Sequence, residues 1–185
     1  MNILRGWWVV MAELSWHRAL VRSAAILVLI AAVSGCVATR APVVLMTSFD
    51  AQAAAFINAS GRAKVSGQAF VRRNDGKLLR AVGTDVFLIP RTAYADERVA
   101  AIYGDGKQPR MGGQLPDADP LYEQYMRKTV ASSGGSFSFD HVADGDYYVI
   151  AMIHLPSDYG FYQAAILERV SVQGGRSVRL VMRGY

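Results

Sequence analysis

Apolar and polar residues alternate with a period of two along much of the chain after residue 62, a pattern typical of strands with one buried face. Clusters of Asn, Asp and Gly, which tolerate the backbone conformations of tight turns, separate the alternating segments. The pattern predicts an all-β, antiparallel sandwich of seven short strands, over residues 63–72, 85–89, 129–132, 136–139, 146–155, 164–172 and 177–183.

Aromatic residues gather on one face of two of these strands. Phe137 and Phe139 lie two positions apart, and Tyr147 begins a similar row in the next strand. Residues two positions apart share a face of a strand, so we expect these rings to form core rather than a binding surface. The Tyr147 hydroxyl is expected to hydrogen-bond a neighbouring loop, as buried tyrosines usually do.

Residues 91–127 interrupt the strand pattern with a long insertion. Compact domains rarely keep loops of this length without secondary structure, so we expect it to be partly helical. Residues 96–103 have the pattern of a helix that Gly104 would end, and a second short helix is expected over residues 121–126.

The first 35 residues follow a different pattern. Residues 24–33 are an unbroken apolar run, which as a helix would span about 15 Å, half of a bilayer core. The preceding arginines and the small residues Ser34-Gly35 predict a cleaved signal peptide over residues 1–35, with a signal helix. The alternatives are an ordinary secreted protein or a membrane-anchoring helix. Translation starts at Met1 or, for a shorter basic segment, at Met11.

The segment Val33-Ser34-Gly35-Cys36 resembles the lipobox of bacterial lipoproteins, with Val in place of the usual Leu. The resemblance implies cleavage before Cys36, a thioether-linked lipid on Cys36, and acylation of its amino group, as by palmitate. Several acyl chains together anchor a protein firmly to a membrane. Val37, rather than Asp, follows the cysteine, and the same resemblance then implies the outer membrane, with the domain facing the periplasm.

The chain after the signal peptide divides into two parts. Residues 36–62 are expected to form a lipidated tether and a short helix over residues 51–58, capped by Asp50. Residues 63–185 form the sandwich. Cys36 is the only cysteine, so a lipidated chain has no disulfide and its fold depends on the core.

The strands and turns are similar to those of the carboxypeptidase regulatory-like, or transthyretin-like, β-sandwich family. That family opens with a Val-x-Gly-x-Val strand, a glycine turn and an Ala/Gly-x-x-Val-x-Leu strand; the corresponding residues are Val65-x-Gly67-x-Ala69, Gly76 and Gly83-x-x-Val86-x-Leu88. Its later Gly-x-Phe-x-Phe and Gly-x-Tyr motifs correspond to Gly135-x-Phe137-x-Phe139 and Gly145-x-Tyr147. The match covers residues 63–90 and 128–183. It implies a seven-stranded Ig-like or transthyretin-like sandwich that serves as a non-catalytic folding, binding or spacer module.

Charge narrows the classes of partner. The chain has 20 basic and 15 acidic residues, but residues 1–35 contain three of the basic residues and one of the acidic residues. Removing them lowers the net charge from +5 to +3, spread along the chain. Nucleic-acid binding requires basic side chains clustered on one face, so no nucleic-acid partner is expected.

The residue combinations of common catalytic and metal sites are absent after residue 36. No Gly-x-Ser-x-Gly motif occurs, and the two histidines, His141 and His154, do not form a zinc-ligand pattern. His141 is expected to be an exposed turn residue. Asp140, Asp144 and Asp146 match no EF-hand spacing and are expected to form a turn. We therefore expect no catalytic residue, no metal and no cofactor.

The insertion contains the candidate binding residues. Tyrosines with charged neighbours suit recognition of a protein or a sugar, because they combine a large contact area with a polar tip. The candidates are Tyr94, Asp96, Glu97, Tyr103, Tyr122 and Tyr125. The other interpretation is that the insertion is a cap on one sandwich face, with buried tyrosines and solvated charges.

Two classes of function follow. The favoured class is a non-catalytic envelope lipoprotein whose sandwich serves as a binding or structural module, with the membrane as one partner, through Cys36, and an envelope protein or glycan as another. The alternative is an envelope hydrolase with its site in the 91–127 insertion, where Asp96 and Glu97 are the candidate acid–base pair. Adjacent residues lie about 100° apart on a helix, a poor arrangement for joint action on one bond. Raised carboxylate pKa values would favour the hydrolase.

Overall fold

A computed structural model describes residues 43–73, 75–109, 116–157 and 160–184 of the compact unit Pro42–Tyr185. The predicted signal peptide, Cys36 and both candidate start residues lie outside the described residues. Within the described ranges, no helix has both the length and the apolar character needed to span a membrane.

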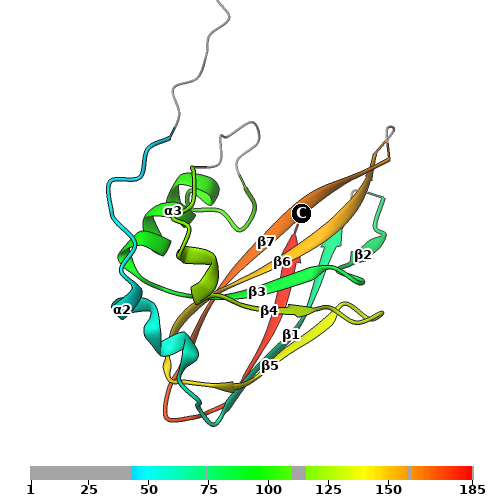
Figure 1. Cartoon of the computed structure of the whole chain (residues 1–185). Coiled ribbons are helices and arrows are strands. Elements are labelled where there is room, and N and C mark those ends of the chain that lie inside the picture. The colour runs from blue at the N-terminus through cyan, green and yellow to red at the C-terminus, as the bar shows by residue number, and fades with distance from the viewer. Residues whose placement is uncertain (1–42, 74, 110–115, 158–159, 185) are drawn as a thin grey trace, which may run out of the picture. The chain divides into compact units, whose positions relative to one another are not determined.

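The unit is built on a sandwich of two sheets (Figure 1). The first sheet contains β1 (Ala63–Arg72), β2 (Leu78–Arg80), β5 (Ser136–Val142) and β8 (Val178–Gly184). The second has the order β4-β3-β6-β7, with β3 (Asp85–Pro90), β4 (Arg127–Val130), β6 (Gly145–Ser157) and β7 (Gly160–Val172). The all-β sandwich expected from the alternating pattern is therefore confirmed.

Two details of the expected sandwich are wrong. The described residues contain eight strands rather than seven, because the three residues of β2 also pair with β1. The sandwich is also not wholly antiparallel, since β8 pairs with β1 in parallel, from Val65 opposite Val178 to Val71 opposite Gly184. β2 and β5 follow one another along the other edge of β1, so β1 is central to its sheet.

The first hydrophobic core lies between the two sheets. Phe137, Phe139, Tyr147 and Val149 are all buried in it, as their spacing predicts. The Tyr147 hydroxyl donates to the backbone oxygen of Ala143 at 2.8 Å, which confirms the expected hydrogen bond to a loop. Gly145, at the start of β6, packs closely against Phe56, because a Cβ atom at this position would lie 2.6 Å from the Phe56 ring.

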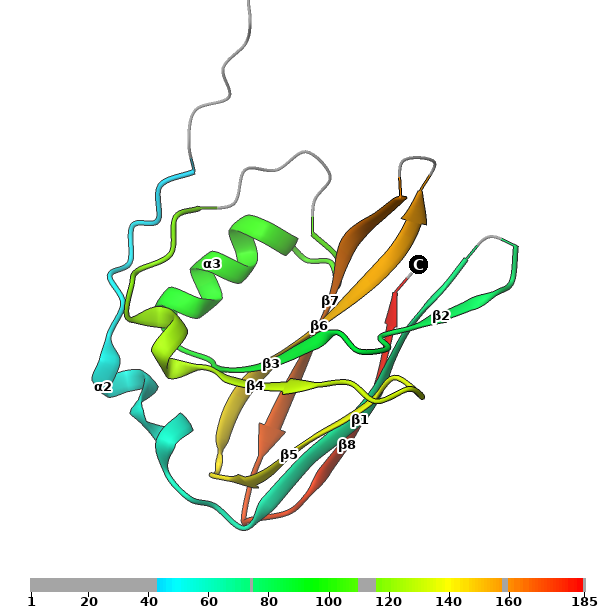
Figure 2. The same cartoon turned by 45° about the vertical axis from the view of Figure 1, so that its right-hand side comes forward.

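A second core covers the outer face of the β4-β3-β6-β7 sheet. The insertion forms the helix α3 (Ala93–Tyr103) and the 3₁₀ helix η2 (Tyr122–Tyr125), so it is partly helical as expected. Figure 2 shows α3 on the side of this sheet that faces away from β1, β5 and β8. Residues Val99 and Tyr103 of α3 pack there against Ile89, Tyr148 and Leu167 of the sheet.

The ends of α3 follow simple capping chemistry. The Thr92 side chain accepts a hydrogen bond from the Ala95 N–H, so the helix starts at Ala93, three residues before the expected start. Gly104 ends it with a φ of 59°, a conformation that side chains disfavour.

Residues 43–62 belong to the folded unit. The segment 43–49, called the strap below, runs alongside α3 in both views, and its Leu45 and Phe49 pack into the second core. Asp50 then caps the helix α2 (Ala51–Ala54), and the 3₁₀ helix η1 (Ala55–Asn58) completes the segment predicted as one short helix. The part of the predicted tether that follows residue 42 is thus packed on the domain rather than extended from it.

Candidate functional site

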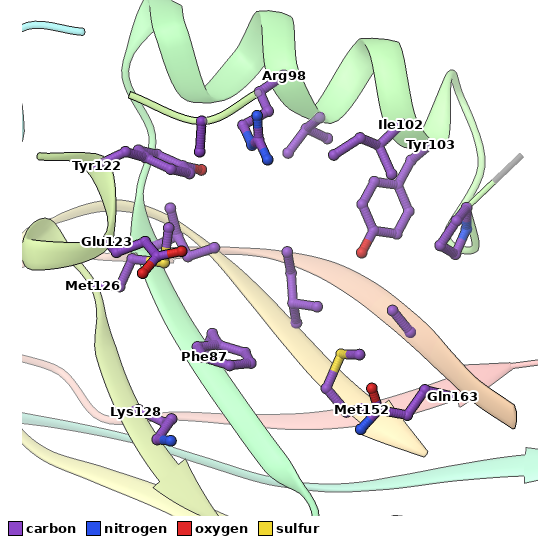
Figure 3. Close-up of a pocket in the computed structure, with 16 residues that line it drawn as sticks. Phe87, Arg98, Ile102, Tyr103, Tyr122, Glu123, Met126, Lys128, Met152 and Gln163 are labelled. Atoms are coloured by element: carbon purple, nitrogen blue, oxygen red, sulfur yellow. The ribbon is translucent and has the colours of Figure 1, made fainter. Parts of the chain in front are cut away.

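An open cleft of about 890 Å³ lies between α3, η2 and the outer face of the β4-β3-β6-β7 sheet (Figure 3). This volume is within the range of pockets that take small molecules. The strands supply its floor, whereas α3 and η2 supply the opposite wall.

The floor is apolar because β3 and β6 carry apolar residues on both faces. Val86 and Val149 point into the first core, so their neighbours Phe87 and Ile150 point outward. Met152 continues this outward row along β6, and Ala165 extends it on β7. Phe87, Ile150 and Met152 remain only partly buried, because no described side chain covers them on the cleft side.

Two buried tyrosines point their hydroxyls into the cleft. Tyr103 from the last turn of α3 is 5% exposed, and Tyr122 from η2 is 4% exposed. Neither hydroxyl has a hydrogen-bond partner among the described residues. No described side-chain oxygen is both inaccessible to solvent and without a hydrogen bond, so these two hydroxyls must be accessible. Both hydroxyls therefore open into the cleft, as Figure 3 shows. Burial raises the pKa of Tyr103 to about 12 and raises that of Tyr122 further, so both are neutral donors and acceptors.

Charged and amide groups lie at the edges of the cleft. The Arg98 guanidinium lies 5.7 Å from the centre of the Tyr122 ring and donates to the Pro116 backbone oxygen at 2.6 Å. The Glu123 carboxylate has no partner among the described residues. The Lys128 ammonium lies 3.5 Å from an Asp85 oxygen, and both side chains are largely exposed. Gln163 is on the far side, near Met152 in Figure 3.

The other two candidate tyrosines lie outside the cleft, around Phe49 of the strap. The ring centres of Tyr94 and Tyr125 lie 5.6 and 5.4 Å from that of Phe49. The Tyr94 hydroxyl accepts a hydrogen bond from the Asp119 N–H at 2.8 Å. These two tyrosines therefore fit the interpretation of the insertion as a cap, whereas Tyr103 and Tyr122 line the cleft.

Asp96 does not line the cleft and lies in a polar cluster near the N-terminal end of α3. Its carboxylate accepts two hydrogen bonds of 3.1 Å from Arg91 and one of 2.7 Å from the Tyr148 hydroxyl. Partial burial acts to raise the pKa of Asp96, but these hydrogen bonds outweigh it and hold the pKa below its ordinary value.

Glu97 binds the strap. Its two carboxylate oxygens accept hydrogen bonds from the backbone N–H groups of Met46, at 2.7 Å, and Thr47, at 2.8 Å. The Met46 N–H is the main cause of the lowered pKa of Glu97. Both candidate carboxylates of the hydrolase hypothesis are thus paired and have lowered pKa values, whereas a general acid needs a raised one.

The sequence prediction missed the floor and most of the edge of the cleft. Phe87, Ile150 and Met152 could have been found from apolar residues on both faces of their strands, a sign of a sheet covered on both sides. Lys128 and Gln163 carry no local signal, because only the tertiary fold brings them to the cleft.

Among the described residues that line the cleft there is no histidine, and Glu123 is the one carboxylate. His141 is exposed, as expected, and adopts a φ of 55° in an irregular pairing of β5 with β1. Across the part of the chain that the structure describes, no three His, Cys, Asp or Glu side chains gather as a metal site would require.

Comparisons with known proteins show the fold. No protein-family model matches the chain, and no curated protein matches it. A solved structure from Pseudomonas aeruginosa, described as a "putative carbohydrate binding protein", superimposes with a TM-score of 0.61. The two chains are 21% identical, and the match covers 75% of this chain and 99% of the other. At this identity the similarity supports the β-sandwich architecture alone.

Proposed function

We propose that the protein is a non-catalytic binding module whose cleft takes a glycan. The observation that carries this proposal is that two buried tyrosines, Tyr103 and Tyr122, point their hydroxyls into the cleft, where neither has a partner among the described residues. Both hydroxyls open into the cleft and bond no described residue, so a polar ligand there can donate to them and accept from them.

The edge of the cleft suits sugar hydroxyls in particular. A sugar hydroxyl both donates and accepts, and the lining of the cleft includes the acceptor Glu123 as well as the donors Arg98 and Lys128. Phe87 adds a partly exposed ring on the floor, against which the C–H face of a sugar can pack. The structural neighbour from Pseudomonas aeruginosa is itself described as carbohydrate binding, which is in keeping with this proposal.

Titration of a glycan panel against the folded unit tests the proposal. We expect one or more envelope glycans to bind, and Tyr103→Phe and Tyr122→Phe each to weaken binding by about 0.5–1.5 kcal/mol, the net value of a neutral hydrogen bond. Tyr147→Phe is the matched control, because its hydroxyl bonds Ala143 in the other core. Equal effects of the three variants, or binding that none of them changes, would exclude the cleft as the glycan site.

We also propose that the unit is a carboxypeptidase regulatory-like domain held at the envelope by lipid on Cys36. Support comes from the lipobox-like segment before Cys36 and from the Gly-x-Tyr motif at Gly145-x-Tyr147. A lipid-anchored outer-membrane protein facing the periplasm would fractionate with outer membranes, and Cys36→Ser would abolish incorporation of labelled palmitate. Labelling that persists in Cys36→Ser would show that Cys36 is not the lipidated residue.

A further inference from the structure

The apolar character of the cleft floor limits which glycans fit. Of the sixteen residues that line the cleft, ten are apolar, two are the tyrosines described above, and four are charged or amide residues. The polar groups lie on the walls and edges, whereas Phe87, Ile150 and Met152 on the floor offer no hydrogen bond. A sugar can pack a C–H face on Phe87, but a hydroxyl turned onto Ile150 or Met152 would lose its hydrogen bonds, and each such loss weakens binding roughly 5- to 150-fold.

The partly exposed apolar side chains of the floor also favour an apolar ligand. Ile150 and Met152 belong to the second core, yet α3 leaves them partly exposed on the cleft side. Partly buried apolar side chains in an open cleft gain free energy when a ligand removes them from water. A hydrocarbon part of a ligand can cover the apolar floor, and hydroxyls of the ligand can hydrogen-bond Tyr103 and Tyr122.

We infer that the ligand is an acylated glycan, whose acyl chain lies on the floor formed by Phe87, Ile150 and Met152 and whose sugar meets the two tyrosine hydroxyls and the cleft edge. This inference rests on the proposed glycan-binding function and adds the class of glycan. A free fatty acid fits less well, because the positive groups Arg98 and Lys128 are balanced by Glu123 and by Asp85 beside Lys128. The edge therefore favours an uncharged headgroup with both donors and acceptors.

Four probes separate the acyl and sugar contributions. Methyl, hexyl and octyl β-glucoside share one sugar and differ in the length of the alkyl chain. Octyl tetraethylene glycol has the alkyl chain of octyl glucoside but no sugar. Each is titrated below its micelle concentration against residues 42–185, which contain both cores and form a compact unit without the preceding segment. Calorimetry and amide chemical shifts report the binding and its place.

We expect affinity to rise about fourfold for each buried methylene, or about 15-fold from the hexyl to the octyl glucoside. The sugar-free probe should bind more weakly than octyl glucoside, and Tyr103→Phe should reduce that difference. Met152→Glu, on the floor, should remove the dependence on chain length. Val181→Glu is the control, because Val181 is an exposed apolar residue on β8 that does not line the cleft.

The possible outcomes distinguish this inference from the proposed function. If methyl and octyl glucoside bind equally well, the acyl inference is overturned while glycan binding stands. If octyl glucoside and the sugar-free probe bind equally well, the cleft is an alkyl site and an acylated glycan is not its ligand. If none of the four probes binds, the acyl inference is also overturned, and the glycan panel alone decides the proposed function.

Discussion

Replacement of the cleft tyrosines by phenylalanine should leave the free energy of unfolding unchanged or raise it. Tyr103 and Tyr122 are 5% and 4% exposed, and their hydroxyls have no partner among the described residues. Both hydroxyls open into the cleft, so their removal breaks no hydrogen bond within the described part of the protein. Phenylalanine keeps the buried ring and loses no such bond, so we expect each variant to gain between 0 and about 1 kcal/mol in the free energy of unfolding.

Tyrosines with bonded hydroxyls should behave in the opposite way. Tyr147 donates to Ala143 at 2.8 Å, and its replacement by phenylalanine should cost about 1 kcal/mol. Tyr148 donates to the charged Asp96 carboxylate at 2.7 Å, and its replacement should cost about 1.5–3 kcal/mol. The four variants thus remove the same atom and differ only in what that atom contacts.

Urea unfolding of the unit Pro42–Tyr185, followed by circular dichroism, measures these differences. With a slope of about 2 kcal/mol per molar urea, a loss of 1 kcal/mol lowers the midpoint by about 0.5 M. If Tyr103→Phe and Tyr122→Phe lost as much stability as Tyr147→Phe, their hydroxyls would have structural partners, and the assignment of the cleft as a polar-ligand site would fail. A gain in stability with a loss of glycan binding would instead identify groups kept for function.

Three further predictions concern the elements around the cleft. Gly145→Ala should destabilise the unit by about 1–3 kcal/mol, because the new Cβ would overlap the Phe56 ring, whereas Gly134→Ala, with nothing closer than 3.8 Å, should change the urea midpoint little. Asp50→Ala should cost about 0.5–2 kcal/mol, because Asp50 accepts from the N–H groups of Gln52 and Ala53; an unchanged thermal midpoint would argue against this cap. Glu97 has a folded pKa below its ordinary 4.5, so its stabilisation of the strap should be complete above that pH and decline as the pH falls through the lower value. Hydrogen exchange at Met46 and Thr47 should rise in that acid range, and Glu97→Gln should show fast exchange at neutral pH as well.

The parts of the fold that depend on local pattern were predictable from the sequence. Period-two alternation located β1, β5 and β8, and apolar runs between turn residues located β3, β6 and β7. Asp50 and Gly104 marked helix ends that the structure confirms. The start of α3 was placed too late because Thr92 reads as an ordinary loop residue until its side chain is seen to cap the Ala95 N–H. β2 was missed because three residues carry too little periodicity to predict a strand.

The cleft itself depends on contacts distant in sequence. Nothing local distinguishes Tyr94, whose hydroxyl accepts from the Asp119 N–H, from Tyr103, whose hydroxyl opens into the cleft. Likewise, Glu97 has the sequence context of a surface carboxylate, and only the path of the strap gives it the backbone partners Met46 and Thr47. Composition could indicate that the insertion binds a ligand or covers one face of the sandwich. Which tyrosines serve which role depends on tertiary packing.

The parallel pairing of β1 with β8 has a consequence for how the chain reaches its fold. Residues 65–71 cannot complete their sheet until residues 178–184 have been synthesised, more than a hundred positions later. Contacts of such large sequence separation form slowly, because a long loop must close before they contribute stability. A growing chain would therefore leave the ribosome with its central strand unpaired on one edge. Any process that acts on the chain before residue 178 is synthesised therefore meets an incomplete sandwich.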